Sequence, residues 1–336
     1  MKGTMTGFAT FGIVGGGAWG TALASVAVRA GRETLLWARE SDVVTSINQA
    51  HCNTTFLPGI ALDPALAATD NLADLSACDV LLLVTPAQAL RSVAGKLSGH
   101  VRPGTPVAIC AKGIEQSSGK FMAEVLAETC PQALPVILSG PSFAADVARG
   151  LPTAVTLACA DEQIGRALCA ALNPPTFRPY FSADVLGAQI GGAVKNVLAI
   201  ACGAAEGKGL GASARAALTT RGFAELTRFG AALGARAETL MGLSGLGDLI
   251  LTCNSPQSRN MSLGMELGKG KNVSDILGAR KSVSEGAYTA EAVVRMAHER
   301  GIDMPIASAV HAVVSGALDV DDAIEALLAR PLKTET

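Results

Sequence analysis

The sequence has little charge and few aromatic side chains. Charged residues make up 17% of its 336 residues and aromatic residues 4%, whereas about 25% charge is usual for a soluble domain. Hydrophobic residues make up 49%, which excludes intrinsic disorder because disorder requires low hydrophobicity and high charge. The apolar content is therefore mostly aliphatic. It predicts a large core or subunit interface, typical of helices packed on a buried parallel sheet.

An excess of charge of one sign is also missing. The formal net charge is −2, from 27 basic and 29 acidic residues. Without a Lys- and Arg-rich run or enough aromatic rings to stack on bases, the chain is not expected to bind nucleic acid. Any anionic ligand must instead be met by a few individually placed cations.

Long apolar runs are missing as well. The best candidate, residues 194–205, is shorter than the roughly 18 to 20 residues that a membrane helix needs, and it contains Lys195. Neither terminus carries the pattern of a signal peptide, a lipidation site or a retention signal. We therefore expect a cytoplasmic protein without stable membrane insertion.

Cysteine and histidine are present without the spacing of a metal site. The eight cysteines form no CxxC pair, and the four histidines do not cluster with them. We expect reduced cysteines that serve as small core residues, and no bound metal.

Apolar runs and helical stretches alternate in the first half of the chain. Strands are predicted at 8–14, 33–37, 80–84, 106–110, 135–138, 153–158 and 176–180, with a helix at 18–30. This order predicts a parallel sheet covered on both faces. Helical periodicity then takes over, at 187–205, 213–233, 288–300, 305–316 and 320–329. The fold class is thus α/β, with an N-terminal parallel-sheet domain over 1–185 and an all-helical domain over 186–336.

A glycine motif lies between the first strand and the first helix. Residues 15–20, Gly-Gly-Gly-Ala-Trp-Gly, fit GxGxxG. We expect Gly15 to allow the tight turn, Gly17 to let the backbone approach a pyrophosphate, and Gly20 to let helix and strand pack closely. The helix N-terminus would offer N–H groups to the phosphates. The motif predicts a Rossmann-type dinucleotide site.

The second strand ends without the acid that is typical of NAD-preferring enzymes. It continues into Arg39 and Glu40. An Arg here can pair with a 2′-phosphate or stack on adenine. We therefore predict use of both NADP(H) and NAD(H), with NADPH favoured several-fold to a hundredfold. The alternative is a solvated surface charge.

Lys195 is the best candidate for the proton carrier that a dehydrogenase needs. It lies among small and apolar residues on a predicted helix, with Gly191 and Gly192 one turn earlier. These glycines are expected to leave room for a ligand, and burial or a neighbouring cation is expected to lower the pKa of Lys195. The alternative is a lysine that extends from a core helix to solvent.

Other polar residues follow predicted strands or lie in turns. Lys112 and the turn 139–144 come directly after strands, where open α/β sheets bind ligands. Residues 242–248 form a Gly-rich turn that ends in Asp248, and Ser258-Arg259-Asn260 supplies donors that suit a phosphate. Singly, each could be structural. Together they indicate a small phosphorylated substrate beside a nicotinamide ring.

These segments resemble bacterial NAD(P)-dependent glycerol-3-phosphate dehydrogenases. The similarity covers about 90% of the chain and is strongest in the glycine loop with Trp19, AKGIE at 111–115, GPSFA at 140–144, GGAVKNVLAIACG at 191–203, TRGFAEL at 220–226, GLSGLGDLILTC at 242–253 and SRN at 258–260. The resemblance implies a Rossmann domain, a helical domain and a homodimer. It also implies reversible reduction of dihydroxyacetone phosphate to sn-glycerol 3-phosphate, for phospholipid synthesis.

The resemblance also implies roles for individual residues. It makes Lys195 the proton acceptor, or the donor in the reducing direction. The positions that match substrate contacts are Lys112, Gly140, Ser142, Lys195, Asp248, Ser258, Arg259 and Asn260. The positions that match cofactor contacts are Gly15, Gly17, Ala18, Trp19, Gly20, Arg39, Lys112, Ala144, Arg259, Val283 and Glu285.

The chain departs from the family pattern at three positions. Ala18 replaces a usual Ser and so loses a possible side-chain bond to the pyrophosphate; Asp146 replaces Glu and Ser213 replaces Asn. Two other functions stay open: another lysine-dependent Rossmann enzyme, acting on a hydroxyacid or sugar phosphate, and a non-catalytic cofactor sensor. A substrate panel separates these possibilities.

Overall fold

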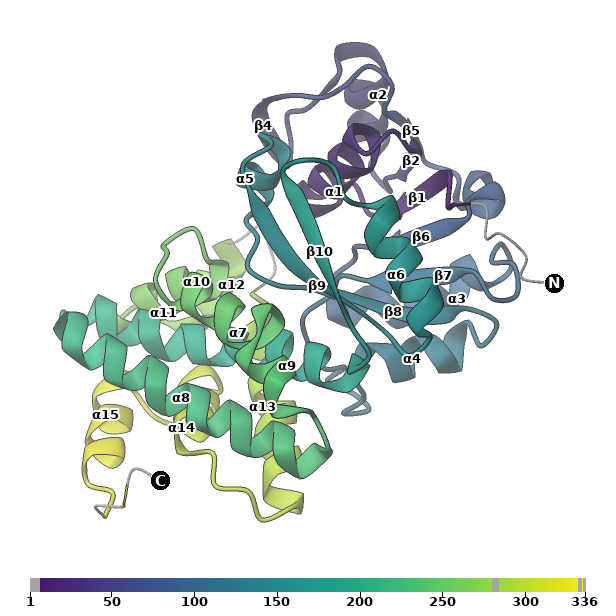
Figure 1. Cartoon of the computed structure of the whole chain (residues 1–336). Coiled ribbons are helices and arrows are strands. Elements are labelled where there is room, and N and C mark those ends of the chain that lie inside the picture. The colour runs from purple at the N-terminus through teal and green to yellow at the C-terminus, as the bar shows by residue number, and fades with distance from the viewer. Residues whose placement is uncertain (1–6, 280–283, 332–333, 335–336) are drawn as a thin grey trace. The chain divides into compact units, whose positions relative to one another are not determined.

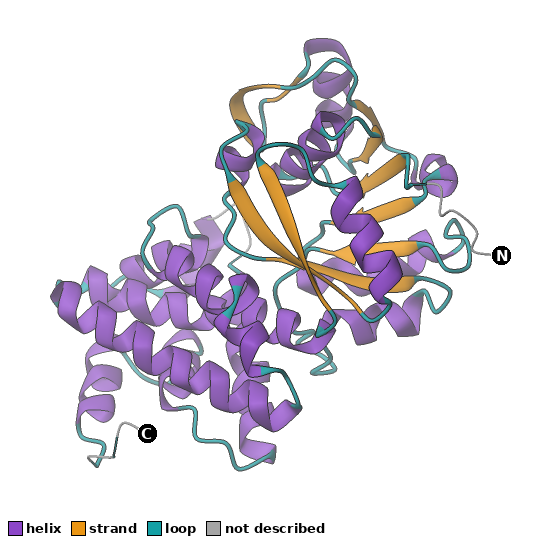
Figure 2. Cartoon of the chain, in the orientation of Figure 1, coloured by secondary structure: helices purple, strands orange, loops and turns teal. Residues whose placement is uncertain are grey.

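The chain divides into two compact units in the computed structural model, which describes residues 7–279, 284–331 and 334. The first unit contains residues up to Lys112 and Lys120–Gln189, and the second contains Gly113–Gly119 and residues from Ile190 onward. All strands of the described residues lie in the first unit (Figure 2). The sequence-based boundary at 185/186 falls at the start of helix α7 (Val185–Gly207), which continues from the first unit into the second.

The first unit is built on an eight-stranded sheet of order β10-β9-β8-β7-β6-β1-β2-β5. Its neighbours pair in parallel except for β8 and β9, which are antiparallel. The predicted parallel sheet is confirmed, with this one pair as a departure. The bounds are β1 (Thr10–Val14), β2 (Glu33–Trp37), β5 (Ala67–Thr69), β6 (Val80–Leu83), β7 (Pro106–Ile109), β8 (Leu134–Ser139), β9 (Thr153–Cys159) and β10 (Phe177–Ser182).

Helices cover both faces of this sheet (Figure 1). On one face, Ile13 and Leu82 pack in a core with helices α1 (Ala18–Arg29) and α6 (Glu162–Ala171). On the other face, Leu81 and Leu83 pack with α3 (Leu90–Ser98) and α4 (Met122–Thr129). Burial on both faces explains why β6 is an uninterrupted apolar run.

The strand order reverses beside β1. The chain adds β2 and β5 on one side of β1, and then returns to add β6, β7 and β8 on the other side. The carboxyl ends of these parallel strands share one edge of the sheet, and open α/β sheets bind ligands at such a reversal.

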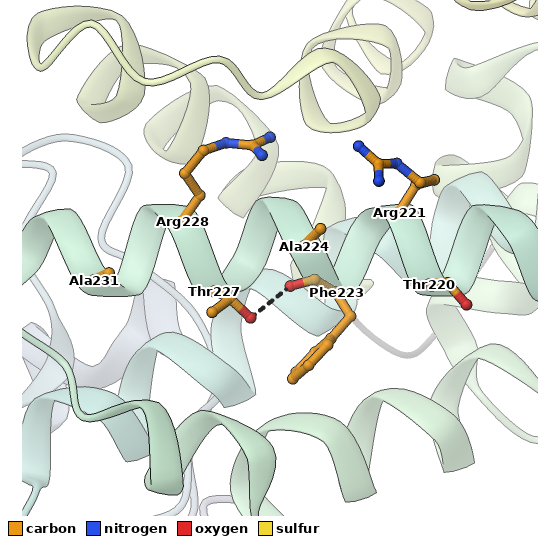
Figure 3. A pocket seen from close by; sticks show the side chains of 7 residues that line it. All are labelled: Thr220, Arg221, Phe223, Ala224, Thr227, Arg228 and Ala231. Carbon is orange, nitrogen blue, oxygen red and sulfur yellow. Dashed lines mark hydrogen bonds between the residues drawn. The ribbon is translucent and has the colours of Figure 1, made fainter. Parts of the chain in front are cut away.

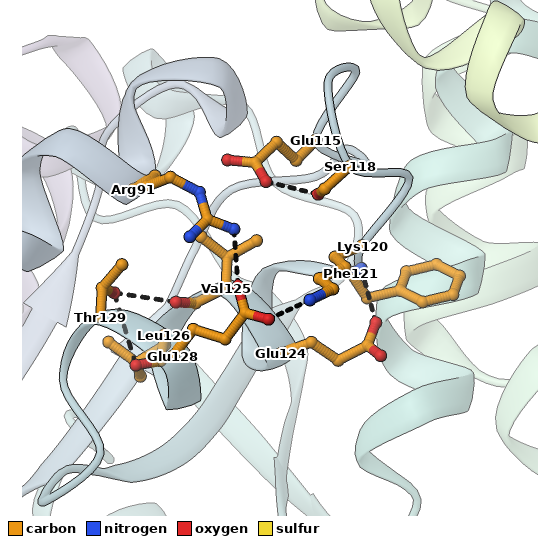
Figure 4. Close-up of polar contacts among 10 residues, drawn as sticks. All are labelled: Arg91, Glu115, Ser118, Lys120, Phe121, Glu124, Val125, Leu126, Glu128 and Thr129. Atoms are coloured by element: carbon orange, nitrogen blue, oxygen red, sulfur yellow. Dashed lines mark hydrogen bonds and ion pairs between the residues drawn. The ribbon is translucent and has the colours of Figure 1, made fainter.

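Shorter elements complete the first unit and were not predicted. They are α2 (Ser41–Ala50), the hairpin β3 (Cys52–Asn53) and β4 (Leu57–Ala61), the turns η1 (Leu72–Ala77) and η2 (Ala87–Ala89), and α5 (Ala144–Ala148). At the start of α4, Phe121 N donates to Glu124 Oε2 at 2.8 Å, while Arg91 and Lys120 pair with Glu128 (Figure 4).

The described part of the second unit is helical, as predicted. The five predicted helices correspond to α7, α8 (Gly211–Leu233), α13 (Glu285–Glu299), α14 (Pro305–Val314) and α15 (Val320–Leu328). Four further helices were missed: α9 (Ala237–Met241), α10 (Asp248–Cys253), α11 (Arg259–Gly268) and α12 (Val273–Ala279). Although α7 is long and apolar enough to cross a membrane by length and composition, 83% of its apolar window is buried.

Close backbone contact joins α7 to α11. A Cβ atom on Gly203 would lie 2.1 Å from the Met261 carbonyl oxygen, and one on Gly264 would lie 2.0 Å from that of Ile200. These approaches leave no room for a side chain. They bring the start of α11 next to the middle of α7, where Lys195 lies.

Candidate active site

The glycine loop has the geometry that the motif predicts. Gly15 has φ +130°, a conformation that side chains disfavour. A Cβ atom on Gly20 would lie 1.8 Å from the Gly15 carbonyl oxygen. The tight turn at Gly15 and the close packing at Gly20 are therefore confirmed. Open space lies next to Gly17, where a Cβ would meet nothing within 4 Å, and its contact with a pyrophosphate stays a prediction.

The first turn of α1 is suited to an anion. The helix starts at Ala18, its N-cap Gly17 makes no side-chain cap, and the first turn contains no acidic residue. Backbone N–H groups and the positive end of the helix dipole can therefore attract an anion, even though Ala18 has no hydroxyl. Trp19 is half-buried and packs against the core on the sheet face that α1 and α6 cover.

Arg39 lies two residues beyond the end of β2. Its side chain is 83% exposed and pairs with Glu40 at 2.7 Å. The neighbouring acid neutralises part of the positive charge that a 2′-phosphate would meet. The role of Arg39 in cofactor choice stays a prediction.

Lys112, Gly140 and Ser142 come together at the ends of β7 and β8. Lys112 Nζ and Ser142 Oγ both donate to the Gly140 carbonyl oxygen, at 2.9 and 3.0 Å. Gly140 has φ +150°, and a Cβ there would lie 2.9 Å from Val155 Cα. Ala144 follows as the first residue of α5.

Two further hydroxyls lie near these strand ends; Ser139 belongs to the turn that the sequence analysis selected, whereas Thr85 was missed. Thr85 follows β6, and Ser139 is the last residue of β8. Both side-chain oxygens are buried, and no group in the described part of the chain hydrogen-bonds to either. Buried polar groups usually have partners, so the carboxyl edge of the sheet holds spare hydrogen-bonding capacity.

Lys195 lies in a buried polar cluster of the second unit. Its Nζ is 2.9 Å from Asp248 Oδ1 and donates to Thr252 Oγ1 at 2.8 Å. Thr252 Oγ1 in turn donates to Asp248 Oδ1 at 3.2 Å. The Lys195 and Asp248 side chains are 8% and 2% exposed, so each charge depends on the other for compensation.

The surroundings of Lys195 match the expectations only in part. Its side chain is buried, as one alternative required, but its close neighbour is a carboxylate and not a cation, and this neighbour favours the charged ammonium. The space beside Gly191 is not free for a ligand either, because a Cβ there would lie 2.5 Å from the Ser244 carbonyl oxygen. This close approach lets the 242–248 segment reach α7 and bring Asp248 to Lys195.

The 242–248 segment is itself more helical than a Gly-rich turn. Leu243–Gly247 form one π-helical turn, and α10 continues from Asp248. Asp248 and Thr252 are therefore four residues apart on one helix and share a face. This i, i+4 spacing was the sequence signal that could have identified Thr252.

The SRN segment forms the start of α11. Ser258 is the N-cap and accepts from Met261 N at 3.2 Å, whereas Arg259 is exposed. Asn260 Nδ2 donates to Asn196 Oδ1 at 2.9 Å, and Asn260 Oδ1 accepts from Gly286 N at 3.0 Å. Asn260 thus links three helices beside Lys195.

Two predicted cofactor positions remain. Glu285 is the first residue of α13 and is half-buried. Val283 lies outside the described residues.

A surface hollow of about 470 Å³ lies along α8 (Figure 3). Arg221 and Arg228 extend to the same side of the helix there, while Thr227 Oγ1 donates to the Phe223 carbonyl at 2.9 Å. None of the predicted site residues lines this hollow.

The first unit thus carries a Rossmann-type sheet with a glycine loop at its reversal point, and the second carries a buried lysine fixed by a carboxylate. Together with the helical second unit, these features define a dinucleotide-dependent dehydrogenase.

Comparison with known proteins identifies the family. Models of the N-terminus and C-terminus of NAD-dependent glycerol-3-phosphate dehydrogenase match residues 10–165 and 184–325. The chain is 63% identical to glycerol-3-phosphate dehydrogenase [NAD(P)+] of Parvibaculum lavamentivorans, covering 96% of this chain and 97% of that protein. It is 58% identical to the same enzyme of Maricaulis maris, covering 99% and 100%.

A solved structure agrees with these matches. The glycerol-3-phosphate dehydrogenase of Coxiella burnetii superposes with a TM-score of 0.91 at 37% identity, covering 96% of this chain and 99% of that one. The chain belongs to the NAD-dependent glycerol-3-phosphate dehydrogenase family, and the predicted resemblance is confirmed. It is an NAD(P)-dependent oxidoreductase.

Proposed function

We propose that the chain reversibly reduces dihydroxyacetone phosphate to sn-glycerol 3-phosphate with NADPH or NADH. The names of the relatives support this reaction. The observation that carries the chemistry is the buried contact of Lys195 with Asp248 and Thr252. The nicotinamide supplies a hydride to C2 when it is bound.

Lys195 handles the proton in this proposal. As the C2 carbonyl becomes an alkoxide, its oxygen gains negative charge and requires a proton, which the Lys195 ammonium donates. Asp248 keeps the lysine charged, and Thr252 fixes the position of Nζ through its hydrogen bonds to both groups. In the reverse direction, neutral Lys195 accepts the proton.

The other site residues bind the two ligands. The glycine loop with Ala18 and Trp19, together with Arg39, holds the dinucleotide, which agrees with a dinucleotide-binding domain over 1–185. In the helical domain over 186–336, Arg259 binds the substrate phosphate, flanked by Ser258 and Asn260. The carboxyl-edge group of Lys112, Gly140 and Ser142 also contacts the substrate. Ala144, Val283 and Glu285 complete the cofactor positions by resemblance.

The enzyme is further proposed to be a cytoplasmic homodimer whose product enters glycerophospholipid synthesis. The low charge content, 17%, supports a buried subunit interface. Light scattering on the purified full-length chain measures the oligomeric state, and a monomer would contradict the proposed homodimer.

Oxidation of NADPH and of NADH by the purified protein tests the reaction. Dihydroxyacetone phosphate is compared with a panel of 2-keto acids and other sugar phosphates, and nicotinamide absorbance is followed. We expect turnover with dihydroxyacetone phosphate and either cofactor. Preference for another carbonyl substrate would contradict the proposal, and tight NADPH binding without turnover would indicate a sensor.

A further inference from the structure

Asn53 is a buried amide that contacts the glycine loop from a distant part of the sequence. It is 0% exposed and lies in β3. Its Nδ2 donates to the Gly16 carbonyl oxygen and to Thr21 Oγ1, both at 2.8 Å. Its Oδ1 accepts from Phe56 N at 3.1 Å. Both donors and the acceptor are therefore satisfied away from water.

The contacts around Gly16 hold its peptide group from the inner side. Thr21 Oγ1 also donates weakly to the Gly16 carbonyl, at 3.4 Å. A Cβ on Gly16 would lie 2.5 Å from Ala38 Cβ. The Gly16 carbonyl is thus fixed toward the protein interior by two side chains.

This anchoring sets the direction of the next N–H group. The peptide bond between Gly16 and Gly17 is trans, and in a trans peptide the carbonyl and the following N–H point to opposite sides. With the Gly16 carbonyl directed toward Asn53, the Gly17 N–H is directed away from it. Gly17 is also the loop glycine beside open space.

We infer that Asn53 is a positioning residue for dinucleotide binding, which holds the Gly16–Gly17 peptide so that the Gly17 N–H faces a phosphate of the cofactor. The inference rests on the proposed assignment of the loop as the dinucleotide site. It gives the β3–β4 hairpin a function, because the hairpin carries the amide that sets the loop. Asn53 itself touches neither cofactor nor substrate in this account.

The test measures NADPH affinity in full-length Asn53 variants by fluorescence titration. Asn53→Ala removes both donors, and we expect the Kd for NADPH to rise about tenfold or more, the equivalent of one buried hydrogen bond or more. The kcat at saturating NADPH should stay within about threefold, because the proton carrier is untouched. If Asn53→Ala does not fold, Thr21→Val removes the bridging hydroxyl and should raise the Kd several-fold.

Asn53→Asp provides a readout that a purely structural role would not produce. The introduced carboxylate has no donor for the Gly16 carbonyl, but it regains one when it is protonated. Burial favours the protonated form. The ratio of variant to wild-type Kd should therefore fall as pH is lowered from 8 to 6. A ratio independent of pH would overturn the inference.

Two control variants distinguish a specific role of Asn53 from a general structural role and from a wrong assignment of the cofactor site. The first is Asn48→Ala. Asn48 also bridges two elements of the first unit through its amide, donating to the Ala68 carbonyl at 2.9 Å and accepting from Ala68 N at 2.8 Å. Asn48→Ala should leave the Kd for NADPH unchanged. An equal rise in both alanine variants would reduce Asn53 to a general structural residue.

Gly17→Val tests the loop assignment itself. Loss of NADPH binding in Gly17→Val together with an unchanged Kd in Asn53→Ala would overturn the role of Asn53 alone. Unchanged NADPH binding in Gly17→Val would instead contradict the proposed cofactor site.

Discussion

The glycine loop of the first unit and the Lys195 cluster of the second are built in opposite ways. The loop is made of backbone, and a side chain on Gly15 or Gly20 would collide with it or strain it. The cluster is made of buried charged side chains, and Lys195 and Asp248 each compensate the other. We therefore expect cofactor binding at the loop to be sensitive to added atoms, and catalysis at the cluster to be sensitive to the loss of one charged partner.

Replacing the proton carrier should have the largest effect. General acid catalysis typically contributes about 10²- to 10⁴-fold, so Lys195→Met should lower kcat by that factor. Steady-state assays with dihydroxyacetone phosphate and NADPH measure this loss. Lys208 pairs with Asp321 at 2.6 Å on the same unit, and Lys208→Met should keep wild-type kcat. A wild-type kcat in Lys195→Met would refute the assignment.

Removing the proposed phosphate-binding cation should have the next largest effect. Arg259 is exposed at the start of α11, and its guanidinium is a planar fork of donors that suits a dianion. Arg259→Ala should raise the KM for dihydroxyacetone phosphate strongly, with kcat/KM about 100-fold lower, since each factor of ten is worth about 1.4 kcal/mol. Arg300→Ala, another exposed arginine of the second unit, is the control. A KM within twofold of wild type would place the phosphate elsewhere.

The helical unit contains another buried carboxylate, Glu225, whose surroundings differ from those of Asp248. Asp248 has an ammonium partner within hydrogen-bonding distance, whereas Glu225, 2% exposed, accepts from two backbone groups, Ile306 N and Ala307 N, at 2.7 and 3.1 Å. Burial raises the pKa of Glu225 from 4.5 to about 7. The stability that protonated Glu225 contributes is therefore present below its unfolded pKa and is lost as pH rises through the folded pKa.

Glu225→Gln should remove the part of the pH dependence of the free energy of unfolding that arises from Glu225. Between about pH 5 and pH 7, the wild-type free energy of unfolding should fall about 2 kcal/mol more than that of the variant. Urea unfolding at both pH values measures the difference. Glu124→Gln, which alters an exposed cap of α4, should follow the wild type. Parallel pH profiles for wild type and Glu225→Gln would show that Glu225 is ionised throughout.

Cofactor choice should show the smallest effect. Because Arg39 is 83% exposed and already paired with Glu40, its contribution belongs near the low end of the predicted range, and exposed pairs are worth under about 1 kcal/mol. We expect NADPH to be favoured about three- to fivefold in kcat/KM, and Arg39→Ala to remove most of that preference by raising the KM for NADPH. Arg102→Ala, also exposed, should leave the ratio unchanged. A wild-type preference for NADH would make Arg39 a surface charge.

The two regions also differ in how far the sequence predicts them. The glycine loop is local, so the order strand, GxGxxG, helix was enough to place it and to assign the roles of Gly15 and Gly20. The Lys195 cluster depends on contacts between residues more than 50 positions apart. The sequence supplied Lys195 and Asp248 as candidates, but not the carboxylate contact or the packing of Gly191 against Ser244 that produces it.

Three other features of the structure were also not predicted from the sequence, because they depend on contacts between distant residues or on segments too short to show a period. The antiparallel β8–β9 pair has the same apolar pattern as a parallel one, because both faces are buried. Short helices such as α10 and α11 have too few residues for a clear period. Asn53 lies 37 positions from the carbonyl that it binds, and a single Asn before a turn carries no signal of such a contact.

NADPH titration of Lys195→Met and Gly17→Val tests the division of tasks between the two regions most directly. We predict that Lys195→Met binds NADPH within about twofold of wild type while it loses about 10²- to 10⁴-fold in kcat. Gly17→Val should lose NADPH affinity because its side chain enters the space beside the loop. Wild-type NADPH affinity in Gly17→Val, or lost affinity in a folded Lys195→Met, would contradict the account.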